Sequence, residues 1–112
     1  MLNELASILN INVMEIPEVF RRAKPQALKL RIYDDMLARY PSVDPKKLHQ
    51  WLGKWTGTRQ YLMRIGYGSN RHDLDGNDFG VISDADREAA RTRLQNMFEK
   101  WKARQAGKEE RV

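Results

Sequence analysis

The 112-residue sequence contains no cysteine, which excludes disulfide bonds and every thiolate metal site. It has no apolar run close to the roughly 20 residues that span a bilayer, and its N-terminus lacks the basic stretch that opens a signal peptide. P-loop, G-x-S-x-G and G-x-G-x-x-G motifs are also missing. We therefore expect a cytoplasmic protein with one modest core, and no enzyme.

Residues with metal-binding or acid–base chemistry are few and poorly spaced. The two histidines are His49 and His72, whereas zinc takes three or four protein ligands at recognisable spacing. The acidic segment that begins at Asp73 resembles a calcium loop, but Gly76 comes at position four instead of six and Asp84 replaces the bidentate glutamate at position twelve. We expect neither a metal nor another cofactor.

Acidic residues are scarce in the middle of the chain. Residues 19–72 contain twelve Lys and Arg against three acids, a net charge of +9, whereas the whole chain carries +5. A basic central segment flanked by weakly acidic ends favours a surface that binds a polyanion such as a nucleic acid. A basic interaction module for an acidic protein partner is the alternative, and a solvated basic surface is the simplest interpretation.

The apolar pattern between Leu48 and Ile65 follows helical spacing twice, with a break at Thr56-Gly57-Thr58. The first face consists of Leu48, Trp51, Leu52 and Trp55, and the second of Tyr61, Leu62 and Ile65. The break predicts two helices that meet at a corner, with Thr56 or Thr58 capping the second. A helix start can seat a phosphate, Lys54 and Arg59 flank this one, and Tyr61 could stack on a base.

The remaining segments predict further helices and one hairpin. We expect a short helix within residues 1–15, a helical turn that places Ile16 and Phe20 in the core, a helix over 27–40, a helix from Asp44-Pro45, a hairpin over 71–82 and a last helix over 83–103. Leu74, Phe79, Val81 and Ile82 are expected on the buried side of the hairpin, and Met97, Phe98 and Trp101 in the core. The fold class is therefore mainly α with a small β-hairpin (α+β), as one domain over residues 1–104 with a polar, frayed tail over 105–112.

With these elements in order, the sequence resembles the ProQ/FinO family of bacterial RNA-binding proteins, which act as RNA chaperones. The resemblance runs from about Ile16 to Arg104. It is carried by Ile16-Pro17 with Phe20, by Ala-Leu-Lys-Leu-Arg-Ile-Tyr-Asp-Asp over 27–35, by the segment from Leu48 to Leu62, and by Arg71-His-Asp-Leu-Asp-Gly-Asn77 with Gly80. The Asp-Leu-Asp-Gly-Asn hairpin behind a Thr-x-x-x-x-Tyr-Leu corner is specific when all parts occur in this order.

The resemblance implies a helical domain with a concave and a convex face. It also implies binding of structured RNA, preferably a stem-loop followed by a short single-stranded 3′ tail, as in small RNAs and messenger 3′ ends, and hence post-transcriptional regulation. The concave face would take the 3′ end, and a helix N-terminus beside it would seat phosphates of the stem. The long basic extensions of some relatives are absent from these 112 residues, so we expect a minimal, monomeric version with no membrane partner.

Several positions match the family's binding residues. Lys29, Tyr61, Arg71 and Arg91 stand at basic or aromatic family positions, and two threonines stand at the capping corner. Other positions depart from the family pattern, because His49 and Gly53 replace arginines and Pro45 replaces a lysine. The full set of expected RNA-binding residues is Lys29, Lys46, Lys47, His49, Lys54, Thr56, Thr58, Arg59, Tyr61, Arg71 and Arg91.

Overall fold

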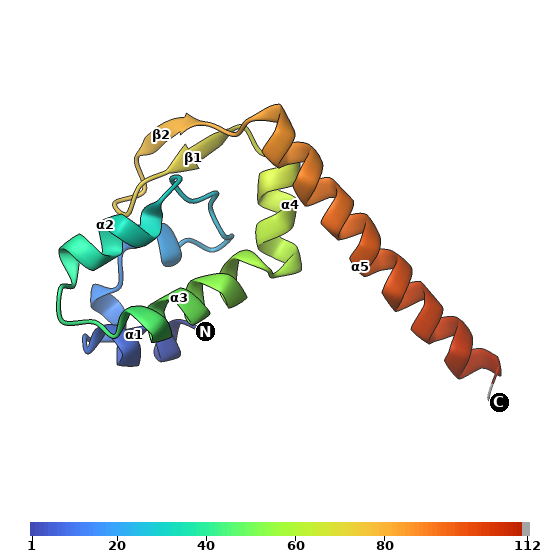
Figure 1. The fold of residues 1–112 in the computed structure, drawn as a ribbon, viewed down its shortest axis with the longest axis horizontal. Helices are drawn as coiled ribbons and strands as arrows, with labels where there is room; N and C mark the ends of the chain where they lie inside the picture. The colour runs from blue at the N-terminus through green and yellow to red at the C-terminus, as the bar shows by residue number, and fades with distance from the viewer. Residues whose placement is uncertain (111–112) are drawn as a thin grey trace.

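The computed structural model describes residues 1–110, and the side chains of residues 1–107. Along these residues the elements are α1 (Leu2–Leu9), η1 (Val13–Glu15), η2 (Glu18–Phe20), α2 (Ile32–Arg39), α3 (Pro45–Thr56), α4 (Arg59–Tyr67), β1 (Asn70–His72), β2 (Asp78–Val81) and α5 (Asp84–Glu110). The elements up to β2 form a rounded body, and α5 runs away from it as a long arm (Figure 1). The prediction of a mainly helical fold with a small antiparallel hairpin is confirmed.

Three aromatic side chains from η2 and α3 meet at the centre of the body. The ring of Phe20 stands edge-on to those of Trp51 and Trp55, at centroid distances of 5.4 and 5.7 Å. Trp51 and Trp55 stack on each other at 5.1 Å. Phe20 and Trp51 are fully buried together with Ile16, so the predicted core positions of Ile16 and Phe20 are confirmed. Such rings bury a large apolar area for a chain of this size.

The two predicted starts of α3 and α4 are confirmed. The Asp44 carboxylate accepts hydrogen bonds from the backbone N–H groups of Lys46 and Lys47, and Pro45 occupies the first helical position. At the corner, the Thr58 hydroxyl accepts a hydrogen bond from the Tyr61 N–H and caps α4. Thr56 does not cap, since its hydroxyl donates back to the Leu52 carbonyl within α3.

The predicted helix over 27–40 is wrong in its first part. Leu28 pairs with His72 beside the hairpin, through hydrogen bonds from the Lys29 N–H to the His72 carbonyl and from the His72 N–H to the Ala27 carbonyl, both 2.7 Å long. The backbone turns into α2 at Arg31, whose φ is +64°. Because the sheet satisfies these backbone groups, residues 27–29 stay extended, and α2 begins only at Ile32.

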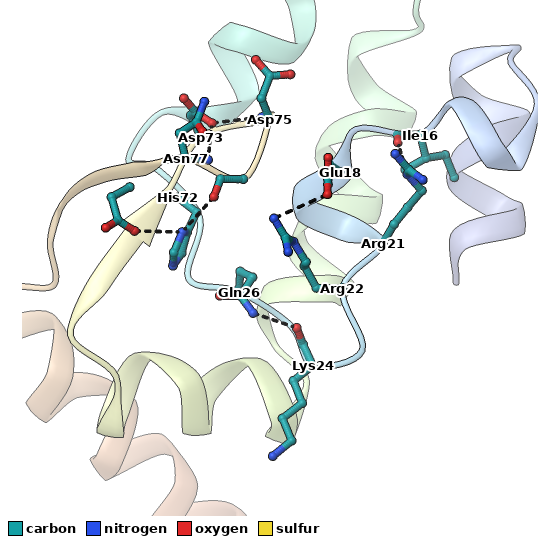
Figure 2. A network of polar contacts seen from close by, with 12 residues as sticks. Ile16, Glu18, Arg21, Arg22, Lys24, Gln26, His72, Asp73, Asp75 and Asn77 are labelled. Carbon is teal, nitrogen blue, oxygen red and sulfur yellow. Dashed lines mark hydrogen bonds and ion pairs between the residues drawn. The ribbon is translucent and has the colours of Figure 1, made fainter.

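The predicted hairpin forms, with residues 73–77 as the turn between β1 and β2. Asp73 closes its turn by accepting hydrogen bonds from Asp75 and Asn77, as Figure 2 shows. Gly76 adopts a φ of +85°, which favours glycine. Leu74 and Ile82 are buried as predicted. The predicted burial of Phe79 and Val81 is wrong, because all four residues of β2 are exposed.

Helix α5 begins as predicted, with the Ser83 hydroxyl accepting from the Asp86 N–H, but it continues past residue 103 to Glu110. Ala90 is buried and Leu94 half-buried against the body. Beyond this contact the predicted burial of Met97, Phe98 and Trp101 is wrong, since these side chains are exposed. The prediction of a frayed tail is wrong for residues 105–110, which are helical, and residues 111–112 lie outside the described part of the chain. No helix in residues 1–110 combines the length and the apolar character needed to cross a bilayer.

Candidate nucleic-acid interface

Helix α4 has one buried and one open face. Tyr61, Leu62 and Ile65 point into the core. The residues of the other face, Gln60, Met63, Arg64 and Tyr67, follow the helical spacing i, i+3, i+4, i+7 and line a shallow hollow with Ala23, Lys24, Pro25 and Gly68. We call these residues the α4 hollow. No sequence motif predicted this hollow, although the spacing of Met63 and Tyr67 marks a second apolar face.

The N-terminal corner of α4 carries positive charge and free hydrogen-bond donors. Thr58 caps the helix with a neutral hydroxyl. Within the described residues, the backbone N–H groups of Arg59 and Gln60 have no hydrogen-bond acceptor, as is usual at a helix start. Arg59, at the start of α4, and Lys54, in the last turn of α3, have exposed side chains, and Lys54 makes only a loose, exposed ion pair with Glu4 at 3.7 Å. The macrodipole of α4 adds to this positive potential.

Arg93 of α5 completes this corner, and sequence reasoning did not assign it a role. One of its guanidinium nitrogens lies 3.8 Å from the position that a Cβ on Gly57 would occupy. The contact needs α5 to pack along α4, which the local spacing of the sequence does not reveal. We call Lys54, Thr58, Arg59 and Arg93 the α4 corner. It combines three cations, from the last turn of α3, the start of α4 and α5, with two unpaired backbone N–H groups at the start of α4. This set of groups is suited to a phosphate.

The far end of the α4 hollow is held by two arginines. The Arg64 Nε donates to the Pro25 carbonyl at 3.0 Å and fixes the loop over the helix. The Arg91 Nε donates to the Gly66 carbonyl at 2.7 Å, and its guanidinium lies 4.7 Å from the centre of the exposed Tyr67 ring. Arg91 is therefore tied to α4 beside the α4 hollow, where its guanidinium lies over the exposed Tyr67 ring. Its expected contact with RNA stays a prediction.

The basic loop before residue 27 is mostly engaged in internal contacts. Figure 2 shows the Arg21 guanidinium on the Ile16 carbonyl, at 2.8 Å, and that of Arg22 toward Glu18, at 3.5 Å. The Lys24 side chain points away from this network (Figure 2). Of the three basic side chains in this loop, Lys24 is thus the one that lines the α4 hollow.

A second basic group lies at the start of α3. Lys46, Lys47 and His49 are exposed, and the His49 ring stands edge-on to Tyr33 at 5.7 Å. They stand at the opposite end of α3 from the α4 corner, about 17 Å away along a 12-residue helix. Here the Asp44 carboxylate occupies the backbone N–H groups that a phosphate would use. The anionic cap makes this helix start a poorer phosphate seat than the neutral cap of α4.

Tyr61 and Arg71 lie together, but both are buried, with exposures of 6 and 7%. The Leu28 N–H donates to the Tyr61 hydroxyl at 3.2 Å, and Arg71 Nη1 donates to the Leu28 carbonyl at 2.8 Å. Arg71 Nη2 also pairs with Asp86 at 2.9 Å. Burial raises the pKa of the Tyr61 phenol above its usual 10.0. Both side chains were expected to bind RNA, but in this structure neither the Tyr61 ring nor the Arg71 guanidinium is open to solvent.

Lys29 is also held in place. Its ammonium pairs with Asp35 at 2.9 Å and lies 4.3 Å from the centre of the Phe79 ring. Its charge is thus largely compensated within the domain. Among the described residues, no three His, Asp or Glu side chains gather into a metal-binding group.

Comparison with known proteins identifies relatives of the whole domain. A family model described as the ProQ/FINO family matches residues 2–107. A protein named RNA chaperone ProQ from Vibrio vulnificus (strain CMCP6) is 34% identical over 85 residues, which cover 73% of this chain and 40% of the relative. The chain thus spans less than half the length of that curated relative.

Two solved structures share the fold. A FinO-like RNA chaperone from Neisseria meningitidis MC58 matches with a TM-score of 0.68 at 23% identity, over 84% of this chain and 78% of the other. A ProQ homologue from Legionella pneumophila matches with a TM-score of 0.52 at 26% identity, over 63% of this chain and 62% of the other.

Proposed function

Because the chain belongs to the ProQ/FinO family, we propose that it binds structured RNA and acts as an RNA chaperone, preferring a stem-loop with a short single-stranded 3′ tail. The name of its Vibrio relative, RNA chaperone ProQ, supports the class of ligand. The observation that carries the proposal is the α4 corner, where the Arg93 guanidinium lies beside Gly57 at a neutrally capped helix start with two unpaired backbone N–H groups, next to the exposed Lys54 and Arg59. Binding, without cleavage of the RNA, is the proposed activity.

The proposed geometry places stem phosphates at the α4 corner. Lys54, Arg59 and Arg93 would neutralise them, and the helix start would donate hydrogen bonds. A-form RNA offers few readable base edges in its narrow major groove, so selectivity is expected to come from shape and from the single-stranded end. The α4 hollow adjoins the corner through Gln60 and presents Lys24 and the Tyr67–Arg91 stack to that end.

Tyr61 and Arg71 receive a positioning role in this proposal. They fix Leu28, and Arg64 fixes Pro25, so together they hold the loop that forms one wall of the α4 hollow. Direct contact of Tyr61 and Arg71 with terminal nucleotides stays a prediction, since it requires the Arg71–Asp86 pair to open. Thr56 supports the end of α3 and is not proposed to touch RNA.

The remaining basic residues that were predicted to bind RNA are proposed to act at longer range. Lys46, Lys47 and His49 would attract a longer stem that runs along α3 from the corner. Lys29 would contribute less, because Asp35 compensates its charge.

A binding experiment with three RNAs tests the proposal. The RNAs are a hairpin with a short 3′ tail, the same hairpin with a blunt end, and an unstructured strand of equal length, measured by fluorescence anisotropy over a salt series. We expect the tailed hairpin to bind most tightly, and its affinity to fall steeply with salt. Equal binding of the blunt hairpin would remove the 3′-tail preference. No binding of any RNA at moderate salt would refute the proposal and favour an acidic protein partner.

A further inference from the structure

The outer part of α5 exposes an apolar stripe that nothing in the described chain covers. Met97, Phe98 and Trp101 have exposures of 39, 52 and 51%, and Figure 1 shows this part of the helix standing clear of the body. The rings of Phe98 and Trp101 stack on each other with centroids 5.9 Å apart and planes 27° apart. We call residues 94–107 the α5 arm.

Positive charge borders this stripe on both sides. With 3.6 residues per turn, every basic residue from 91 to 104 projects within about 100° of Trp101 around the helix axis. These residues are Arg91, Arg93, Lys100, Lys102 and Arg104. Glu99 is the one acid between residues 91 and 107, and it projects at about 160°, on the opposite side. The stripe and its borders thus combine aromatic rings with a net charge of +4.

We infer that the α5 arm binds unpaired nucleotides, with bases stacking on Phe98 and Trp101 and phosphates meeting the bordering cations; this inference rests on the proposed function. Aromatic side chains beside basic residues are the chemistry with which proteins hold single-stranded nucleic acid. A second copy of this chain fits the stripe less well, because its residues 91–107 would bring a further net charge of +4 against the first copy, with no acidic edge to pair with it.

The position of the α5 arm supports this occupant. Arg93 lies at the junction of the arm with the α4 corner, and Trp101 is eight residues further, about 12 Å along the helix. The stripe continues the face that packs on α4 through Ala90 and Leu94, so beyond that contact it faces the side on which the corner lies. A strand that leaves a stem held at the corner meets the arm without crossing the body.

Single substitutions on the arm test the inference. Trp101→Leu and Phe98→Leu retain apolar, helix-forming side chains but remove the aromatic surface, and Asn96→Ala on the opposite face is the matched control. Each variant is titrated with the tailed and the blunt hairpin. We expect Trp101→Leu to weaken binding of the tailed hairpin about five- to tenfold. Its affinity for the blunt hairpin, and the affinity of Asn96→Ala for either RNA, should change by less than about twofold. Unchanged binding of the tailed hairpin by both leucine variants would overturn the inference.

Two further measurements separate this inference from its alternatives. Trp101 is far more exposed than Trp51, so quenching of tryptophan fluorescence by the tailed hairpin should disappear in Trp101→Leu. Light scattering on the free protein tests whether the arm instead binds a second copy of the chain. If the wild type forms a dimer that Trp101→Leu dissociates, and RNA binding is unchanged in that variant, the inference is overturned. If the wild type binds neither hairpin, the proposed function itself fails. If it binds both hairpins and the leucine variants bind them with the same affinity, RNA binding stands and only the role of the α5 arm is refuted.

Discussion

Tyr61 and Arg71 hold the two sides of one peptide segment, since the Tyr61 hydroxyl accepts from the Leu28 N–H and Arg71 donates to the Leu28 carbonyl. Both side chains come from elements that follow Leu28 by more than thirty residues. They therefore join α4, β1 and the extended segment before α2 into one unit. The loop that borders the α4 hollow depends on this unit for its position.

Removal of the Tyr61 hydroxyl should destabilise the fold. Tyr61→Phe leaves the buried Leu28 N–H without a hydrogen-bond acceptor. This should lower the free energy of unfolding by about 1–2 kcal/mol. Tyr33→Phe is the control, because the Tyr33 hydroxyl makes a long, exposed bond of 3.4 Å to the Pro45 carbonyl and should cost less than about 0.5 kcal/mol. Urea denaturation of both variants measures the difference, and equal effects would contradict the role given to Tyr61.

The Arg71–Asp86 pair should respond unequally to loss of its two members. Arg71→Gln removes the buried guanidinium that donates to the Leu28 carbonyl. It is expected to lower the free energy of unfolding by about 2–4 kcal/mol. Asp86→Asn should cost about 1 kcal/mol, because the Asp86 side chain is 47% exposed and water can solvate the end of Arg71. Chemical denaturation compares the two, and a larger effect of Asp86→Asn would show that the pair, not the bond to Leu28, fixes Arg71.

The raised pKa of Tyr61 predicts a pH dependence at the alkaline end. Its folded pKa lies above the 10.0 of the unfolded chain, so the contribution to stability is fully present below pH 10 and is lost as the pH rises through the folded pKa. Stability should therefore fall above pH 10, and Tyr61→Phe should make that fall shallower. Urea midpoints measured from pH 8 to 11 test this, and parallel curves for the two proteins would contradict it.

Two glycines should respond to alanine in opposite directions. Gly76→Ala places a side chain at a φ of +85° and within 2.8 Å of the Arg22 guanidinium, and should destabilise by about 1–2 kcal/mol. Gly53→Ala lies within α3, where nothing stands within 4 Å, and should stabilise by about 1 kcal/mol. Thermal unfolding of both variants tests the turn geometry; a neutral Gly76→Ala would contradict it.

Local patterns in the sequence were sufficient for most of the fold. Cap residues such as Asp44 and Thr58, the helical spacing around Trp51 and the hairpin turn at Gly76 act over a few residues, and each appears in the structure as predicted. The start of α2 could not be predicted in this way. Residues 27–29 have a helical pattern, but their backbone groups are taken by His72, more than forty residues later.

The candidate site depended more strongly on tertiary contacts. Phe98 and Trp101 show the spacing of a core stripe, but whether a stripe is covered depends on how far the body extends along α5, which periodicity does not reveal. For the same reason Arg93 was missed. Tyr61 stands on the apolar helical face with Leu62 and Ile65, and an ion pair of Arg71 with a nearby carboxylate was an open alternative, but local spacing did not decide between these and exposed binding residues. The sequence identified the basic corner near Gly57, and the structure added the α5 side chain that completes it.

The salt dependence of RNA binding tests most directly whether the α4 corner is the phosphate site. The affinity of the tailed hairpin is measured over a salt series for the wild type, for Arg59→Ala with Arg93→Ala, and for Lys46→Ala with Lys47→Ala as the matched pair at the other end of α3. We predict that the corner pair lowers the slope of log K against log salt by about two, and that the lysine pair lowers it by clearly less. A slope unchanged in the corner pair but reduced in the lysine pair would contradict the account and move the site to the start of α3.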